Sequence, residues 1–128
     1  MTTLALTPTA FGWVPGQAGV DLTPADLTAY PNADTGVTFP NYNGNVILVV
    51  SNNQASGTIS VQPVAVRTVE QQAVTVPPYT LANLKTQAFG PFPPNDFNVA
   101  GIMTVNITAT ATGVTVGAFQ FTTAPSQI

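Results

Sequence analysis

The sequence predicts an all-β fold, a single antiparallel β-sandwich or jelly-roll-like domain of about seven or eight short strands, preceded by a long Pro/Gly-rich N-terminal segment. Short runs of β-branched residues recur along the chain, and most alternate apolar with polar residues, as half-buried strands do. Turns rich in glycine, proline and asparagine separate these runs. A chain of 128 residues is long enough for one domain with a substantial core.

The stretch 45–66 is expected to nucleate the domain. Its first run, 46–50, is apolar on both alternating faces, which indicates a strand covered on both sides and central in a sheet. Its second run, 58–66, alternates. Six residues rich in Asn, Ser and Gly join the two runs, so we expect an antiparallel hairpin. Pro63 interrupts the second run and predicts a bulge or strand exit on an edge.

The N-terminal residues 1–36 are interpreted as an extended arm or loop segment, and residues 37–128 as the β-sandwich domain. Four prolines and four glycines in residues 1–36 exclude a long helix. One helical turn is conceivable at 23–27, with Thr23 as its N-cap. Two interpretations stay open: the segment folds back on its own sandwich as an edge strand and loop, or it packs on a neighbouring subunit.

Further strands are expected at 36–39, at 73–76 and, after a turn at 79–80, at 81–89, whereas 67–72 reads as a polar loop. Residues 90–97 contain three prolines and are expected to form an irregular loop. This loop has two interpretations. Its aromatic rings plug one end of the sandwich, or the loop is an exposed contact surface whose backbone is stiffened by the prolines.

The last two strands of the domain are expected after residue 100. Residues 101–110 alternate and predict a half-buried antiparallel strand, followed by a turn at 112–113. Beyond the turn, Val114 and Val116 are expected to point inward. The apolar set then shifts to Phe119 and Phe121, which predicts a glycine-bearing bulge at residues 117–118. The final residues, 123–128, are expected to be a frayed tail.

Composition argues against several classes of function. The net charge is −3 with only two cations, so a phosphate-binding patch for nucleic acid is not expected. The chain has no Cys and no His, which removes disulfides, thiolate metal sites and the commonest general base. The five acids are not paired for acid/base chemistry. We therefore expect no enzymatic activity, no cofactor and no metal. We also expect neither a membrane-spanning segment nor a secretory signal.

The scarcity of charge points toward contacts with other proteins. Charged residues are 5% of the chain, against about a quarter in a typical protein. The surface must therefore be covered by Thr, Ser, Asn, Gln and Gly, whose hydroxyl and amide groups are less costly to desolvate than charges. This composition favours a protein that functions as part of a larger assembly.

Five stretches along the chain together resemble the small β-sandwich capsid decoration (cement) proteins of tailed bacteriophages. They are Leu4-Ala-Leu-Thr-Pro8, Asn45-Val-Ile-Leu-Val-Val-Ser-Asn52, Val74-Thr-Val-Pro-Pro78, Gly90-Pro-Phe92 and Met103-Thr-Val-Asn-Ile107. The resemblance implies a non-enzymatic virion protein, assembled in the host cytoplasm, that binds the outer surface of the head and stabilises it. Its implied partners are the major capsid protein and copies of itself, as a trimer or other homo-oligomer.

The candidate contact residues are apolar and lie on proline-stiffened backbone. In the N-terminal segment they are Phe11, Trp13 and Val14, and in the loop they are Pro91, Phe92 and Phe97. An alternative function is a carbohydrate-binding or receptor-binding module of a fibre or tail. Trp13 and Tyr30 could then form a platform for a sugar, although packing in a core or interface explains these aromatic residues better.

Overall fold

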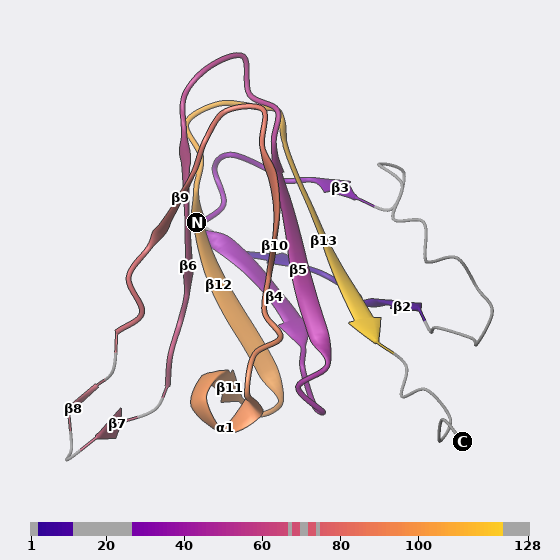
Figure 1. Cartoon of the computed structure of the whole chain (residues 1–128), viewed down its shortest axis with the longest axis vertical. Coiled ribbons are helices and arrows are strands. Elements are labelled where there is room, and N and C mark those ends of the chain that lie inside the picture. The colour runs from indigo at the N-terminus through magenta and orange to yellow at the C-terminus, as the bar shows by residue number, and fades with distance from the viewer. Residues whose placement is uncertain (1–2, 12–26, 67, 70–71, 74, 122–128) are drawn as a thin grey trace.

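The computed structural model describes residues 3–11, 27–66, 68–69, 72–73 and 75–121, and in them the chain is nearly all β, as predicted. Two mostly antiparallel sheets lie side by side (Figure 1). Sheet A has the order β1 (Thr3–Ala5), β4 (Gly36–Pro40), β12 (Ile102–Thr108), β6 (Ile59–Pro63) and β9 (Tyr79–Leu81), with β11 (Asn98–Val99) beside β12. Sheet B has the order β10 (Thr86–Phe89), β5 (Val46–Asn52), β13 (Val114–Phe121) and β2 (Thr9–Phe11), with β3 (Thr28–Ala29) beside β13.

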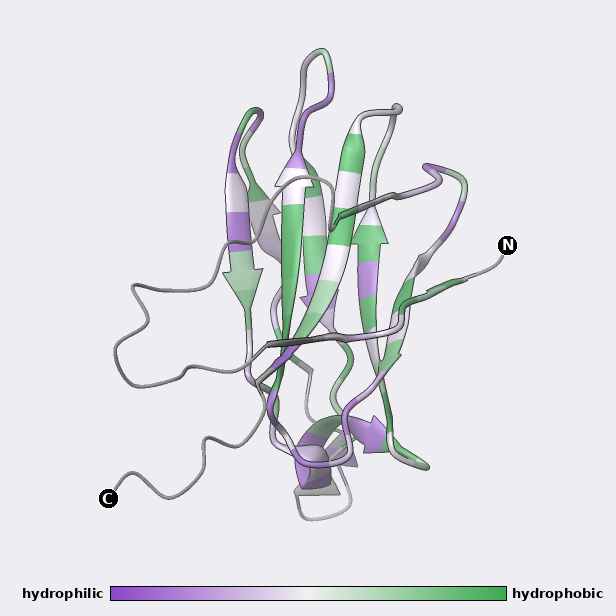
Figure 2. Ribbon diagram, turned by 90° about the vertical axis from the view of Figure 1, so that its right-hand side faces the viewer, coloured by the Kyte–Doolittle hydropathy of each residue, from purple (hydrophilic) through white to green (hydrophobic). Residues whose placement is uncertain are grey.

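The two sheets share one core because successive side chains along a strand point to opposite faces. Figure 2 shows hydrophobic residues alternating with more polar ones along several of the strands. β12 follows the prediction for residues 101–110. Met103, Val105 and Ile107 are fully buried, while Asn106 and Thr108 are exposed. In sheet B, the inward residues of β5 and β13 join the same core cluster. The predicted half-buried strand is therefore confirmed.

The central position of 46–50 is also confirmed, but its predicted hairpin is wrong. β5 lies between β10 and β13 in sheet B, whereas β6 lies between β12 and β9 in sheet A. Residues 53–58 therefore cross from one sheet to the other. Buried amides stabilise this crossing: Asn52 Nδ2 donates to the carbonyls of Gly57 and Leu81, at 3.1 and 3.2 Å. A polar loop has the same composition whether it joins two strands of one sheet or crosses between two sheets, which is why the prediction failed.

The predicted bulge in β13 is absent. β13 pairs with β5 in one unbroken register from Val114↔Asn52 to Gln120↔Val46. Val114, Val116 and Ala118 belong to the shared core. Phe119 has the opposite parity, so it points to the outer face of sheet B, where it is nevertheless 1% exposed. The apolar pattern shifts because this strand is covered on both faces, and the register stays constant.

Residues 64–89 differ most from the prediction. The expected turn at 79–80 lies within β9, and the chain turns at 82–85 instead, so the expected single strand 81–89 belongs to two sheets. Residues 75–76 are not in a strand. The expected polar loop contains the short ribbon of β7 (Thr68–Val69) and β8 (Gln72–Ala73). Pro63 ends β6 as predicted, but β6 is an internal strand rather than an edge.

The N-terminal segment and the loop 90–97, which each had two interpretations, both place some of their residues against the rest of the domain. Within the N-terminal segment, β1 pairs in parallel with β4, β2 pairs in parallel with β13, and β3 pairs antiparallel with β13. Residues 12–26, which hold all but the last residue of the conceivable helical turn at 23–27, and the expected tail at 123–128 lie outside the described residues. The loop 90–97 is more regular than predicted, because α1 (Pro94–Phe97) forms one helical turn.

Candidate functional site

The outer face of sheet A is a broad surface of uncharged polar side chains. On β12, Thr104, Asn106 and Thr108 alternate with the core residues and therefore point outward. The registers place their cross-strand neighbours on the same face, since opposite residues in an antiparallel pair share a side. We call this surface the polar face, and it comprises Thr38, Ser60, Gln62, Thr80, Thr104, Asn106 and Thr108. In the part of the chain that the structure describes, the charged residues are Asp34, Lys85 and Asp96, and the polar face includes none of them, although Asp34 lines a hollow that opens on this face.

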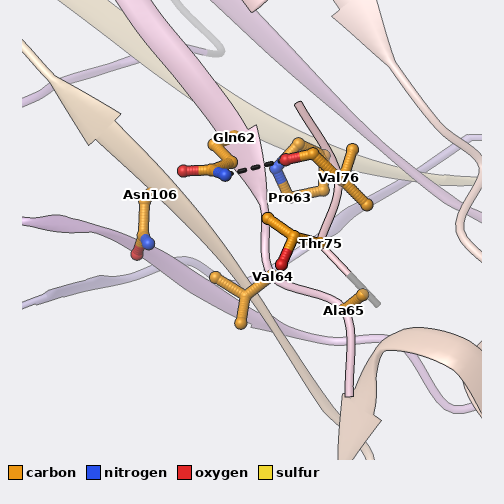
Figure 3. A pocket seen from close by; sticks show the side chains of 7 residues that line it. All are labelled: Gln62, Pro63, Val64, Ala65, Thr75, Val76 and Asn106. Atoms are coloured by element: carbon orange, nitrogen blue, oxygen red, sulfur yellow. Dashed lines mark hydrogen bonds between the residues drawn. The ribbon is translucent and has the colours of Figure 1, made fainter. Parts of the chain in front are cut away.

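Two adjoining hollows open at the centre of the polar face. The smaller has a volume of about 200 Å³ and lies between the end of β6 and the segment 75–76 (Figure 3). The larger, of about 640 Å³, is bounded by residues 32–35 and β12. Gln62 and Asn106 line both hollows, so we name them the Gln62–Asn106 hollows. They place two planar amides at a concave site within a flat face.

Gln62 holds the wall of the smaller hollow in place. Its Nε2 donates to the carbonyl oxygen of Val76 at 2.7 Å, and Figure 3 shows the amide oxygen on the side away from Val76. Asn106 is exposed on the neighbouring strand and pairs with Gln62 in the register. An amide offers both donors and acceptors without a charge. The hollows can therefore receive polar groups of a partner, such as backbone amides, hydroxyls or small side chains.

One end of this face is apolar. The registers align Pro40, Ile102 and Val99 across β4, β12 and β11, and Val99 is 64% exposed. The ring of Tyr42, 68% exposed, lies against Gly101, where a Cβ would overlap it. We call this group of residues the apolar corner, and it comprises Pro40, Tyr42, Val99 and Ile102. The corner gives the uncharged face an exposed hydrophobic margin, which is a feature of protein contact surfaces.

The loop predicted as a contact region is divided between surface and core. Pro91, which follows a cis peptide bond, is exposed. Phe92 is only 5% exposed and belongs to the core, with its ring centroid 6.2 Å from that of Phe39 and 5.6 Å from that of Phe97. Phe97 is half-buried against the same core. The interpretation of Phe92 as a surface contact is therefore corrected: its ring fills the end of the domain, and Pro91 provides the exposed part of the loop.

A hydrogen-bonded pair of asparagines, one of them buried, holds this loop against sheet A, and sequence reasoning missed it. Asn41 is fully buried, and its Nδ2 donates to the carbonyl of Phe92 at 3.0 Å and to Asn98 Oδ1 at 3.1 Å. Asn98 Nδ2 donates in return to the carbonyl of Asn41 at 2.6 Å. An asparagine next to Pro40 resembles any turn residue, so the sequence carried no signal for this pair.

The remaining predicted aromatic contacts are placed as follows. Phe11 is in β2, but its side chain, Trp13 and Val14 lie outside the described residues. Tyr30 is 3% exposed, so it cannot form a surface platform for a sugar. Its hydroxyl donates within the core, at 2.8 Å from the carbonyl oxygen of Asp34 and 2.9 Å from that of Ile107. Burial, and to a lesser extent the Asp34 carboxylate, raises the pKa of Tyr30 to about 12.

The structure adds two observations on metals and membranes. In the residues that it describes, no three side chains of the Asp, Glu, His or Cys type gather as potential metal ligands. None of the helical structure in those residues is long and apolar enough to span a membrane.

Comparisons with protein families, with characterised proteins and with solved structures found no match to this chain. A proposal for its function therefore depends on the fold and on the chemistry of the polar face and the apolar corner.

Proposed function

We propose that this chain is a non-enzymatic structural protein of a virion, a capsid decoration protein that binds the outer surface of an assembled head and stabilises it. We also propose that the two sheets form a β-sandwich of jelly-roll-like type. The shared core of buried side chains from both sheets supports the sandwich. The resemblance of the five sequence stretches to decoration proteins supports the virion role.

The observation that carries the proposed docking is the uncharged polar face beside its apolar corner. Burying an unpaired charge costs far more free energy than burying a hydroxyl or amide that finds a hydrogen-bond partner. The centres of protein interfaces are depleted of charged residues for the same reason. A face whose described outward residues are Thr, Ser, Asn and Gln can thus be covered by a protein surface at low cost, while Val99 and Tyr42 supply apolar area.

Stabilisation of the head follows from mass action in this proposal. A protein that binds only the assembled lattice lowers the free energy of that lattice by its binding free energy at each occupied site. Repetition over a symmetric shell multiplies a modest contribution per site. The major capsid protein is the proposed partner, and no chemical reaction, nucleic acid or membrane is involved.

Co-sedimentation with expanded capsids tests the proposal. We expect the wild-type protein to co-sediment and Asn106→Lys to lose most of its binding, because the new charge would be buried at the centre of the polar face. Ala55→Lys is the matched control, since it adds the same charge to an exposed residue of the loop 53–58, which is outside the polar face and at the end of the domain away from α1 (Figure 1). Failure of the wild-type protein to bind would rule out the capsid role. Full binding by Asn106→Lys would rule out the polar face as the docking surface.

The N-terminal contacts remain part of the proposal and need a separate variant. Deleting residues 1–15 would also remove β1 and β2, which pair with β4 and β13, so a lost signal could reflect misfolding. The single change Trp13→Ser avoids this ambiguity when circular dichroism confirms a wild-type fold. Reduced capsid occupancy is expected, and unchanged occupancy would exclude Trp13 as a contact.

A second candidate function is carbohydrate or receptor binding, and the Gln62–Asn106 hollows favour it. Amide and carboxylate side chains at Asn32, Asp34, Gln62 and Asn106 line a concavity of a size that suits a small ligand. Selective binding on a glycan array, lost in Gln62→Ala and retained in Ala55→Lys, would favour this function. Capsid binding without any glycan signal would favour decoration.

A further inference from the structure

The edge of sheet B at β10 is an open strand edge of four residues. β10 ends the sheet, and three of its four residues, Thr86, Gln87 and Ala88, are exposed. The strand itself contains no proline and no charged residue, two of the features by which proteins prevent edge pairing, and Lys85 directly precedes it. Among the described residues, no strand pairs with its outer side.

The hydrogen bonds to β5 show which backbone groups face this open edge. Asn52 N–H donates to the carbonyl of Lys85 at 2.9 Å, so residue 85 points its backbone groups at β5. Backbone direction alternates along an antiparallel ladder, so Gln87 and Phe89 also point toward β5. Thr86 and Ala88 point the other way. Each therefore presents one N–H and one C=O to a strand that would add to the sheet.

An aromatic pair, in which one ring is exposed and the other partly buried, lies beside the same edge. Tyr79, on the edge strand of sheet A, is 43% exposed, and its ring centroid is 5.5 Å from that of Phe89 in an edge-to-face arrangement. The Tyr79 hydroxyl donates to Gln87 Oε1 at 3.1 Å. A strand added to β10 would cover part of this pair, so apolar burial would accompany the new backbone hydrogen bonds.

We propose that β10 pairs with β10 of a second copy of this chain, antiparallel and across a two-fold axis at Gln87, so that the two B sheets become one continuous sheet. This register places Thr86 opposite Ala88 of the copy, with each donating to and accepting from the other. Opposite residues in this register have the same parity, so the inner and outer faces of the two sheets match.

The side chains of the edge complement those of a second copy. At the axis the two Gln87 amides meet, and an amide can donate to and accept from its own kind. The two Lys85 side chains lie at opposite ends of the paired region, so no like charges face each other. A two-fold interface must be self-complementary in this way. The pairing does not depend on the capsid role, but two linked copies would bind a lattice with greater avidity.

Light scattering after size exclusion tests the pairing. We expect the wild-type protein to have twice the single-chain mass of 13.2 kDa and Ala88→Pro to have the single-chain mass. The Ala88 N–H faces the open edge, so this proline removes a donor to the copy and none to β5. Ala88→Ser keeps the N–H and should remain dimeric. A wild-type protein of single-chain mass, or an Ala88→Pro variant that stays dimeric, would overturn the proposal.

A cysteine cross-link gives a second test that does not depend on proline. The chain has no cysteine, so Gln87→Cys introduces a single thiol at the axis, where the two copies approach closely. Under mild oxidation it should form a disulfide-linked dimer much faster than Ala55→Cys, a control in an exposed loop. Equal rates for the two variants would contradict the pairing, even if Ala88→Pro failed to fold.

Discussion

Asn41 and Asn98 bind each other through both a side-chain and a backbone contact. Asn41 Nδ2 donates to Asn98 Oδ1 at 3.1 Å, and Asn98 Nδ2 donates to the backbone carbonyl of Asn41 at 2.6 Å. Asn41 Nδ2 also donates to the carbonyl of Phe92. One buried side chain at the end of β4 is therefore bonded both to the loop before α1 and to the residue that follows α1. The pair therefore holds the loop that carries Pro91 against the end of β4.

Asn41→Ala should lower the free energy of unfolding by about 1–2 kcal/mol, because it removes two hydrogen bonds and leaves the buried carbonyl of Phe92 unpaired, while it also removes the buried, unpaired Oδ1 of Asn41 itself. Urea denaturation would measure the loss. Asn43→Ala is the control, because Asn43 is the same residue type two positions further along the chain and its side chain is exposed. It should change the free energy of unfolding by less than about 0.5 kcal/mol. Similar midpoints for the two variants would show that the asparagine pair contributes little.

Tyr30 should make the fold sensitive to alkaline pH. Its pKa is about 12 in the folded chain and 10.0 ordinarily, so the unfolded chain loses this proton first. The contribution of neutral Tyr30 to the free energy of unfolding is therefore complete below pH 10, and it is lost progressively as the pH rises toward 12. Tyr30→Phe should be less stable than the wild type at neutral pH, because the buried carbonyls lose their donor, and the difference should shrink between pH 10 and 12.

Thermal unfolding of the wild type and Tyr30→Phe across pH 8 to 12 would follow this difference. Tyr42→Phe is a suitable control, because the Tyr42 side chain is exposed. A gap between the wild type and Tyr30→Phe that stays constant up to pH 12 would argue that Tyr30 does not cause the alkaline loss.

Two glycines should differ in their tolerance of alanine. A Cβ at position 36 would overlap the backbone carbonyl oxygen of Val105 on the neighbouring strand, which cannot move without breaking the β4–β12 ladder. A Cβ at Gly101 would meet the exposed ring of Tyr42, which can rotate away. The main cost at Gly101 is its φ of 83°, about 1–2 kcal/mol for a residue with a side chain.

We therefore expect Gly36→Ala to destabilise the chain clearly more than Gly101→Ala, by chemical denaturation. The double variant Gly101→Ala with Tyr42→Ala should recover little of the loss, because backbone strain would remain. A large recovery would mean that the contact with Tyr42 dominates instead.

How far the sequence determined these features depends on whether the information was local. The alternation of β12 correctly predicted a half-buried strand, and the two-sided apolar pattern of β5 correctly predicted a central one. Both predictions succeeded because the pattern of apolar residues within a strand indicates which of its faces are buried. The partner of β5 was not predictable in this way: β5 pairs with β10 and β13, and β13 begins more than sixty residues later. The candidate site shows the same division. Its lack of charge was evident from composition, whereas the meeting of Gln62 with Asn106 required the register of β6 and β12.

Phe119 offers the last test, because it separates burial on the outer face of sheet B from burial in the shared core. It is 1% exposed and lines a hollow with Val49 and Leu27, away from the inward residues of β13. Phe119→Ala should cost about 3–4 kcal/mol, as for a core phenylalanine, because the apolar area lost is the same on either face. Thr115→Ala, at the same hollow, should cost less than about 1 kcal/mol. A mild effect of Phe119→Ala in urea denaturation would mean that the outer face collapses readily around the missing ring and that the shared core alone determines stability.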